Sequence, residues 1–312
     1  MEVYIDKEFL DSFYADFDER DVQKRLEKLF INYGSKQVFI ECSESDFESL
    51  YNENEIFSNI VSSGTTVIPI ESIKSHLFDK SNYDQTLVFT YDELGWFKNA
   101  ENEGVLCFSF DNYEHKIKTI IENLHFKIDL SESFPGWDFA SVFKKIKFNK
   151  ISISDAYIFT DTDNKRISEN IIPFLKKLID ININRLSVGV FTKYFNSLQP
   201  NEASKMEKIH RIHNLFNSTF SKSNVKFKII STEYSQTGFK RHDRYIATNF
   251  SILDCGMGFN LVPFTPNDSQ IISETIFDYY TYKRLKNLLL YQSKYISKLN
   301  RLDSLSFIMF PN

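Results

Sequence analysis

Residues 240–244 form a short basic run that could hold a phosphate group. The segment reads Lys240-Arg241-His242-Asp243-Arg244, so that three cationic side chains surround one imidazole. Lys and Arg side chains are the usual partners of phosphate oxygens, and Arg can contact two of these oxygens at once. We therefore predict that Lys240, Arg241 and Arg244 contact a phosphate group beside His242.

The spacing that follows His242 resembles the motif of the phospholipase D superfamily. In that family a His-x-Lys pair is followed after four residues by Asp, and after six more by Gly. The corresponding residues here are His242, Arg244, Asn249 and Gly256. Together with the upstream Asp155-x-Tyr157 and the Gly256-x-Gly258 pair, they make residues 146–265 similar to one branch of the superfamily. That branch is the phospholipase-D-like C-terminal domain found beside microtubule-interacting-and-transport modules.

This resemblance implies covalent phosphoryl transfer without a metal. One His attacks phosphorus, and a second, from a paired motif, protonates the leaving oxygen. The implied catalytic residues are His242, Arg244 and Asn249, with phosphate contacts from Lys240, Arg241 and Gly256. Asn249 replaces the family's carboxylate, and an amide carries no charge to stabilise an imidazolium. Because the sequence holds one such motif, we expect a homodimer through the C-terminal half in which two His242 side chains meet.

Acidic residues at predicted strand ends are the second group that could do chemistry. The stretches Tyr4–Asp6 and Leu87–Leu94 make residues 1–125 similar to a PIN-like domain, a parallel α/β fold that hydrolyses RNA. The resemblance implies Mg²⁺ or Mn²⁺, since clustered carboxylates need a cation that then activates a water. The predicted metal ligands are Asp6, Glu41 and Asp92. Glu44 and Glu71 are alternatives to Glu41, and strand-end acids also serve as helix caps.

Hydrophobic patterning predicts the elements that must position these residues. Apolar strands alternate with amphipathic helices in both halves, which is typical of an α/β fold with parallel strands. We expect a PIN-like domain over residues 1–125 and a connection over 126–148. A phospholipase-D-like α/β domain over 149–266 and a C-terminal helical extension over 267–312 complete the chain. Within this extension, Ser273–Leu299 is expected to be helical. The other predicted helices include Asp21–Asn32, Asp46–Asn59 and Ile73–Phe78. The predicted strands include Gln37–Glu41, Thr86–Thr90 and Lys150–Phe159, and a hairpin is expected from Tyr245–Asn249 and Ser251–Asp254.

Composition restricts the class of protein. The 312 residues carry a net charge of −5, so that nucleic-acid binding must come from local basic patches. No segment is apolar enough for a membrane-spanning helix, and the N-terminus does not have the pattern of a secretory signal. Three dispersed cysteines fit a reducing compartment. We therefore expect a cytoplasmic protein without a membrane partner.

Two functions remain open from the sequence. The first is a phosphodiesterase, most plausibly a nuclease of a bacterial defence or toxin-type system, in keeping with both resemblances. The second is a non-catalytic recognition protein whose degenerate folds bind nucleic acid, a phosphorylated ligand or a protein partner. Lipid headgroup cleavage is disfavoured, because the chain has no interfacial amphipathic helix with a clear basic face.

Overall fold

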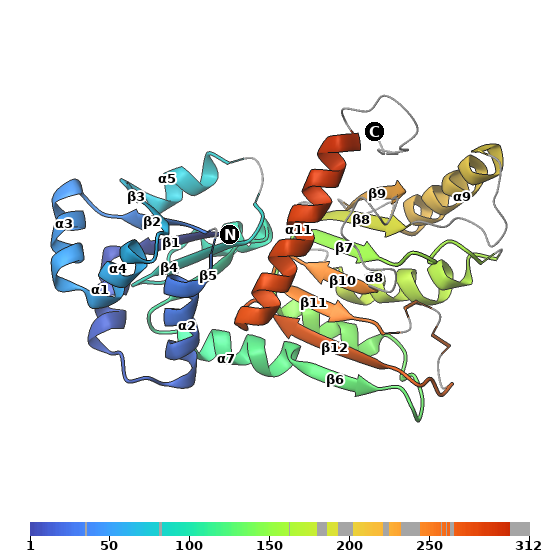
Figure 1. Ribbon diagram of the computed structural model, residues 1–312, viewed down its shortest axis with the longest axis horizontal. Helices are drawn as coiled ribbons and strands as arrows, with labels where there is room; N and C mark the ends of the chain where they lie inside the picture. Colours follow the sequence, from blue (N-terminus) through green and yellow to red (C-terminus); the bar gives the residue numbers. More distant parts are fainter. Residues whose placement is uncertain are drawn as a thin grey trace. The chain divides into compact units, whose positions relative to one another are not determined.

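The computed structural model describes residues 1–34, 36–80, 83–161, 163–179, 186–192, 202–220, 225–231, 244–256, 258–259, 261–262 and 265–299. They form a mixed α/β protein with two compact units (Figure 1). The first comprises Met1–Asn123, Ile146–Asn149 and Thr275–Lys283. The second comprises Leu124–Lys145, Lys150–Glu274 and the chain from Arg284. None of the described helices is both long enough and apolar enough to cross a membrane.

The first unit is built on a parallel five-stranded sheet of order β3-β2-β1-β4-β5. Its strands are β1 (Glu2–Asp6), β2 (Gln37–Glu41), β3 (Thr66–Ile70), β4 (Thr86–Thr90) and β5 (Leu106–Ser109). The helices that follow these strands are α1 (Lys7–Ala15), α2 (Asp21–Asn32), α3 (Glu44–Glu53), α4 (Glu55–Ser62), α5 (Ile73–Phe78), α6 (Phe97–Asn102) and α7 (Tyr113–Leu124). The expected parallel α/β arrangement of this half is confirmed.

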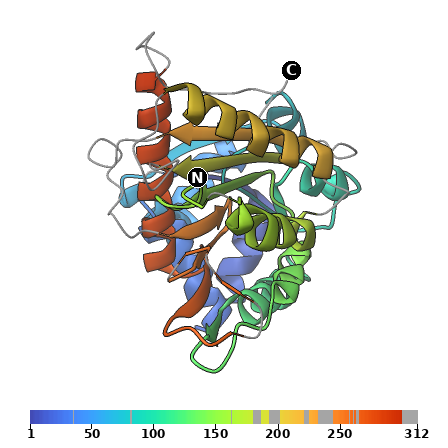
Figure 2. The ribbon, with the colours of Figure 1, turned by 90° about the vertical axis from the view of Figure 1, so that its right-hand side faces the viewer.

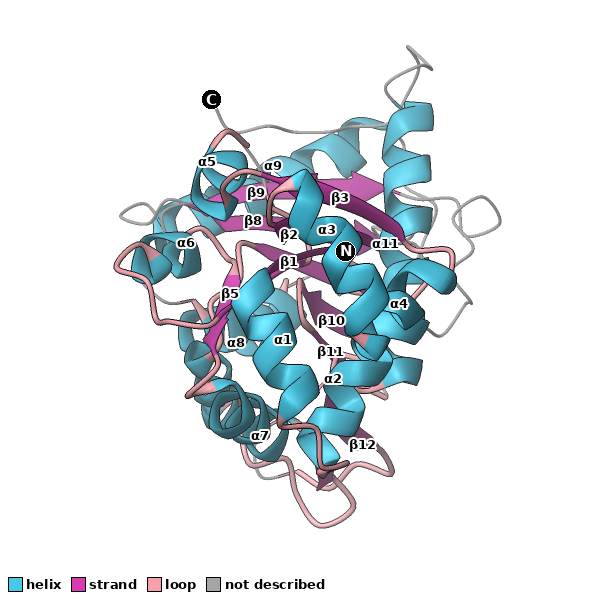
Figure 3. Ribbon diagram, turned by 90° about the vertical axis from the view of Figure 1, so that its left-hand side faces the viewer, coloured by secondary structure: helices cyan, strands magenta, loops and turns pink. Residues whose placement is uncertain are grey.

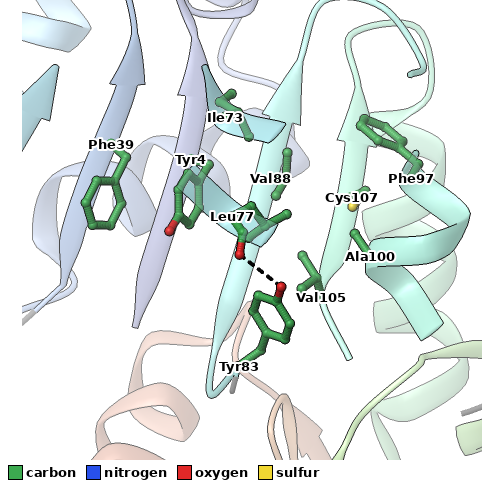
Figure 4. Close-up of a cluster of buried hydrophobic side chains, with 10 residues drawn as sticks. All are labelled: Tyr4, Phe39, Ile73, Leu77, Tyr83, Val88, Phe97, Ala100, Val105 and Cys107. Atoms are coloured by element: carbon green, nitrogen blue, oxygen red, sulfur yellow. Dashed lines mark hydrogen bonds between the residues drawn. The ribbon is translucent and has the colours of Figure 1, made fainter. Parts of the chain in front are cut away.

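Helices cover both faces of this sheet, which is why its strands are apolar on both sides. On one face, Tyr4 and Val88 pack with Leu77 of α5 and Ala100 of α6 (Figure 4). On the other face, the ring of Phe89 lies 5.3 Å from Phe9 of α1 and 5.2 Å from Phe30 of α2. Figure 3 shows α1, α2 and α4 in front of the sheet.

The segment Thr275–Lys283 completes the first unit, although it lies far along the chain. The Tyr33 hydroxyl donates to the carbonyl of Ile276 at 2.9 Å, and the Tyr282 hydroxyl donates to that of Gly34 at 2.7 Å. The Tyr33 and Tyr282 rings stack with centroids 4.4 Å apart. The first unit therefore extends beyond the predicted boundary at residue 125.

The second unit contains a seven-stranded sheet of order β6-β12-β11-β10-β7-β8-β9. Its strands are β6 (Phe126–Asp129), β7 (Lys150–Ser154), β8 (Leu186–Thr192), β9 (Val225–Ser231), β10 (Tyr245–Thr248), β11 (Ser251–Asp254) and β12 (Gln270–Thr275). Strands β7, β8 and β9 are parallel, whereas β10 is antiparallel to both β7 and β11. The sheet is therefore mixed.

The helical segments of this unit precede β7, follow β7 and β8, or follow β12, and the first residues of the last one, Tyr279–Lys283, belong to the first unit. They are the 3-10 helix η1 (Asp138–Lys145), the π-helical turn η2 (Arg166–Ile171), α8 (Ile172–Leu178), α9 (Glu202–Phe220) and α11 (Tyr279–Leu299). Figures 1 and 2 show α11, in red, running across the strands. Gln292 of α11 donates a hydrogen bond to Ser152 of β7.

Three predicted elements differ from the structure. The expected connection 126–148 supplies strand β6 and helix η1. The expected helix Ser273–Leu299 begins as part of β12, in which buried residues alternate with more exposed ones, as in a strand with one face against the core. The predicted strand Lys150–Phe159 ends at Ser154, because a turn begins at Asp155.

Candidate functional site

The strand register of the second unit places Arg244 beside Asp155. Tyr245, the first residue of β10, is the register partner of Ser154, the last residue of β7. Since the two strands are antiparallel, the residue before Tyr245 and the residue after Ser154 meet at the same edge of the sheet. The candidate site therefore lies at the carboxyl end of β7, where ligands commonly bind in α/β folds.

Asp155 is the buried acid of this site, with a relative exposure of 2%. Its Oδ1 accepts a hydrogen bond from the Tyr157 backbone N–H at 2.8 Å, and its Oδ2 accepts one from Phe259 at 3.4 Å. Burial raises the pKa of this carboxyl, while the two backbone donors and the neighbouring Arg244 charge oppose the rise. The turn after β7 and the segment after β11 therefore fix the position of the Asp155 carboxylate next to Arg244.

Arg244 is the cation that lies beside Asp155. Its Nε lies 3.9 Å from Asp155 Oδ1, beyond hydrogen-bond distance, and its side chain is 18% exposed. The guanidinium carbon lies 5.9 Å from the centre of the Tyr157 ring. Within the described part of the chain, the buried Nε has no hydrogen-bond partner. A buried donor without an acceptor is costly, so that Arg244 is held in an unfavourable position in this structure.

Gly258 lies against both of these side chains. Its φ is +84°, and a Cβ atom at this position would lie 2.5 Å from Asp155 Oδ2 and 2.7 Å from Arg244 Cδ. Gly256, the predicted phosphate contact, instead packs toward β12, where a Cβ would lie 2.1 Å from Ser269 Oγ. Of these two glycines, Gly258 is therefore the one in contact with the site.

Two further cations line the loop that follows β7. Arg166 donates through Nη1 to the Tyr157 carbonyl and, at 2.9 Å, to Thr160 Oγ1. Lys208 of α9 is 7% exposed and donates to the Asp161 carbonyl. Burial lowers the pKa of Lys208; the Asp161 charge opposes this shift, and the Arg211 and Arg166 charges add to it. The loop from Asp155 to Asp161 is thus surrounded by Arg166, Lys208 and Arg244.

The predicted residues of the second half are only partly brought together. Lys240, Arg241 and His242 lie outside the described residues. Asn249 is at the opposite end of β10 from Arg244, five residues away, or roughly 16 Å along an extended strand. Its Oδ1 accepts from the Lys150 backbone N–H at 2.9 Å. Asn249 therefore helps to hold the start of β7.

The predicted acids of the first unit lie at the carboxyl edge of its sheet. Asp6 and Glu41 are register partners at the ends of β1 and β2, and Asp92 follows β4. Asp6 accepts from the backbone N–H groups of Phe9 at 2.6 Å and Tyr91 at 2.8 Å. Burial, aided by the Glu41 charge, raises the pKa of Asp6 to about 6.

These acids also satisfy backbone donors. Asp6 caps α1, and the Glu41 carboxylate accepts from the Ile73 N–H at the start of α5. Among the described residues, no three His, Cys, Asp or Glu side chains are grouped so that they could hold a metal ion. The Mg²⁺ or Mn²⁺ site at Asp6, Glu41 and Asp92 stays a prediction.

Sequence reasoning missed part of the second unit's site. Asp155, Tyr157 and Gly258 belong to motifs that were recognised, but they were not assigned to the site. Arg166 and Lys208 carried no local signal, since only the packing of η2 and α9 brings them to the loop. No model of a known protein family matches this sequence, and no curated protein matches it.

Proposed function

We propose that the second unit binds a phosphoester at the carboxyl end of β7 and cleaves phosphodiesters through His242. The observation that carries this proposal is the Arg244 guanidinium, which is largely buried beside Asp155 and whose Nε has no hydrogen-bond partner among the described residues. A phosphate oxygen would accept from the part of this guanidinium that remains exposed, since the side chain is 18% exposed. Arg166 and Lys208 provide further positive charge along the same loop.

The proposed reaction has two steps and rests on the resemblance to the phospholipase D superfamily. The His242 imidazole attacks phosphorus, a nitrogen–phosphorus bond forms, and the ester oxygen departs with a proton from a second His242. Water then attacks phosphorus, releases the imidazole and returns a proton to that second residue. Arg244 stabilises the charge that develops on the phosphate oxygens.

Because each chain supplies one His242, this mechanism requires two copies of the protein. We propose a homodimer through the C-terminal half, with the two imidazoles on either side of one phosphate. Sedimentation at micromolar concentration should give the mass of a dimer. A monomer under assay conditions that still hydrolyses the substrate would contradict the two-histidine mechanism.

The proposed substrate is nucleic acid, in a bacterial defence or toxin-type role, and this part of the proposal also rests on the resemblances. The competing function is recognition without turnover, which Asn249 favours because it stands where the family has a carboxylate. Both functions predict that phosphate compounds bind near Arg244, but only the first predicts hydrolysis.

Hydrolysis of bis-p-nitrophenyl phosphate in the presence of EDTA tests the proposal. Arg244→Ala should lower kcat/KM by roughly 100-fold or more, whereas Arg244→Lys should retain part of the activity. Lys177→Ala is the control, because this exposed cation of α8 is paired with Asp138 at 2.7 Å. Equal activity of Arg244→Ala and wild type would remove Arg244 from the reaction.

A further inference from the structure

The first unit contains a basic and aromatic hollow that the proposed function does not use. It has a volume of about 240 Å³ and lies between α2 and the segment that leads into α11. This is below the roughly 300 Å³ at which pockets for whole drug-sized molecules begin. The side chains that matter here are Lys24, Arg25, Lys28, Tyr33, Tyr279 and Tyr280.

A column of tyrosines forms one wall of the hollow. The Tyr33 ring lies 4.4 Å from that of Tyr282 and 5.4 Å from that of Tyr279, and Tyr279 is 5.7 Å from Tyr280. The hydroxyl groups of Tyr33 and Tyr282 are fixed by backbone carbonyls. At the outer end, Tyr280 is 77% exposed. The column is therefore a rigid support that ends in an open aromatic ring.

Three cations on α2 border these rings. The Lys28 Nζ lies 5.7 Å from the centre of the Tyr279 ring and forms no ion pair within the described chain. Lys24 is paired with Glu19 at 3.0 Å and Arg25 with Asp21 at 2.9 Å. Exposed pairs of this kind contribute little, so that both cations can exchange their partners for phosphate.

The hollow also contains one carboxylate, which is already engaged. Asp278 Oδ1 accepts from the backbone N–H of Thr281 at 2.9 Å and from its hydroxyl at 3.2 Å. The Asp278 carboxylate therefore caps the first turn of α11. Cations from α2 and an exposed ring from another segment thus remain available to one ligand.

We propose that this hollow binds a single-stranded polynucleotide. One base stacks on Tyr280, and the adjoining phosphates lie against Lys28, Lys24 and Arg25. Aromatic rings beside a positive track are the usual recognition elements for single strands, whereas the bases of a duplex have their faces covered. The proposal extends the proposed function to its substrate class, but binding here does not require turnover at His242.

The test measures binding of fluorescein-labelled oligo(dT) and oligo(U) to the full chain by fluorescence anisotropy. All variants carry His242→Ala so that no substrate is cleaved. Tyr280→Ala should weaken binding by roughly 5- to 150-fold, and Tyr280→Trp should preserve it. Lys28→Ala should reduce the slope of log K against log salt by about 1. Comparison of the two oligonucleotides distinguishes DNA from RNA as the preferred strand.

Tyr51→Ala is the matched control, because this tyrosine of α3 is also exposed, at 45%. Its affinity should equal that of the parent. Equal affinities of Tyr280→Ala and the parent, or tighter binding of a duplex than of the single strand, would overturn the proposal. Absence of oligonucleotide binding would also overturn it. The same holds if the surface around Tyr280 is found to bind a protein partner and no oligonucleotide. Hydrolysis of bis-p-nitrophenyl phosphate by the chain with His242 intact is scored separately, so that either proposal can fail alone.

Discussion

The proposed function depends on single side chains at the edge of the second unit's sheet. Asp155 is fixed by two backbone donors, and Arg244 lies beside it with an unpaired Nε within the described structure. The arrangement depends on close approach of the backbone at Gly258. A change at this glycine should therefore affect both stability and phosphate binding.

Gly258→Ala should destabilise the protein more than the same change at Gly136. Both glycines have positive φ, which costs an alanine about 1–2 kcal/mol. Only at Gly258 does the added Cβ meet other atoms, which should cost at least about 1 kcal/mol more. Urea unfolding of the two variants measures the difference. Equal losses of unfolding free energy would show that the close approach at Gly258 is unimportant.

Asp6 should make stability depend on pH in the mildly acidic range. Because its pKa is raised from 3.8 to about 6 in the folded state, ionisation opposes folding. The protonated Asp6 side chain therefore contributes to the free energy of unfolding. This contribution is fully present below pH 3.8 and is lost as the pH rises through about 6. Carbon-13 NMR should give a pKa near 6, and Asp6→Asn should flatten this part of the stability profile. A measured Asp6 pKa at or below 3.8 would contradict the prediction that burial raises the pKa of this carboxyl.

Element boundaries are set by particular polar residues. The predicted helix Asp46–Asn59 is interrupted at Asn54, which is 2% exposed and separates α3 from α4. Its Oδ1 accepts from the Phe57 N–H at 3.0 Å, and its Nδ2 donates to the Leu10 carbonyl at 3.1 Å. The sequence alone favoured one helix, because the partner at Leu10 lies in another element.

Replacing Asn54 should therefore cost more than replacing a helical surface asparagine. Asn54→Ala removes a helix cap and leaves the buried carbonyl of Leu10 without this donor, for an expected loss of about 2–3 kcal/mol. Asn52→Ala is the control and should lie within about 0.5 kcal/mol of wild type, since Asn52 is exposed. Thermal or urea unfolding measures both. Similar values for the two variants would count against a capping role for Asn54.

Local patterns predicted many elements, because their signals are local. Asp21–Asn32, Gln37–Glu41, Ile73–Phe78 and Thr86–Thr90 have the predicted bounds. The pattern around His242 correctly placed a hairpin of β10 and β11 after Arg244. Local patterns failed where distant segments meet. Arg166 and Lys208 reach the site through packing, and Asn249 contacts Lys150 at the far end of the strand.

At the scale of the whole molecule, the chain passes between its two units more than once. Thr275–Lys283 belongs to the first unit, and a local sequence pattern cannot reveal such a return of the chain. Its anchor is Tyr282, which stacks on Tyr33 and donates to Gly34. A boundary derived from hydrophobic periodicity alone therefore assigned this segment to a separate extension.

Tyr282→Ala should consequently weaken the first unit. Loss of a buried ring and its hydrogen bond should cost about 3–5 kcal/mol, and hydrogen exchange should accelerate in α2. Tyr282→Phe should retain the ring contact and lose only about 1 kcal/mol. Unchanged exchange in α2 in the alanine variant would mean that this segment does not support the first unit.

The measurement that tests the central claim most directly is phosphodiester hydrolysis by wild type and His242→Ala. The assay uses bis-p-nitrophenyl phosphate with EDTA present, and circular dichroism verifies that both proteins are folded. The proposed mechanism predicts that wild type hydrolyses the substrate and that His242→Ala loses at least roughly a thousandfold in kcat/KM. Hydrolysis by His242→Ala at the wild-type rate, or none by wild type, would contradict it.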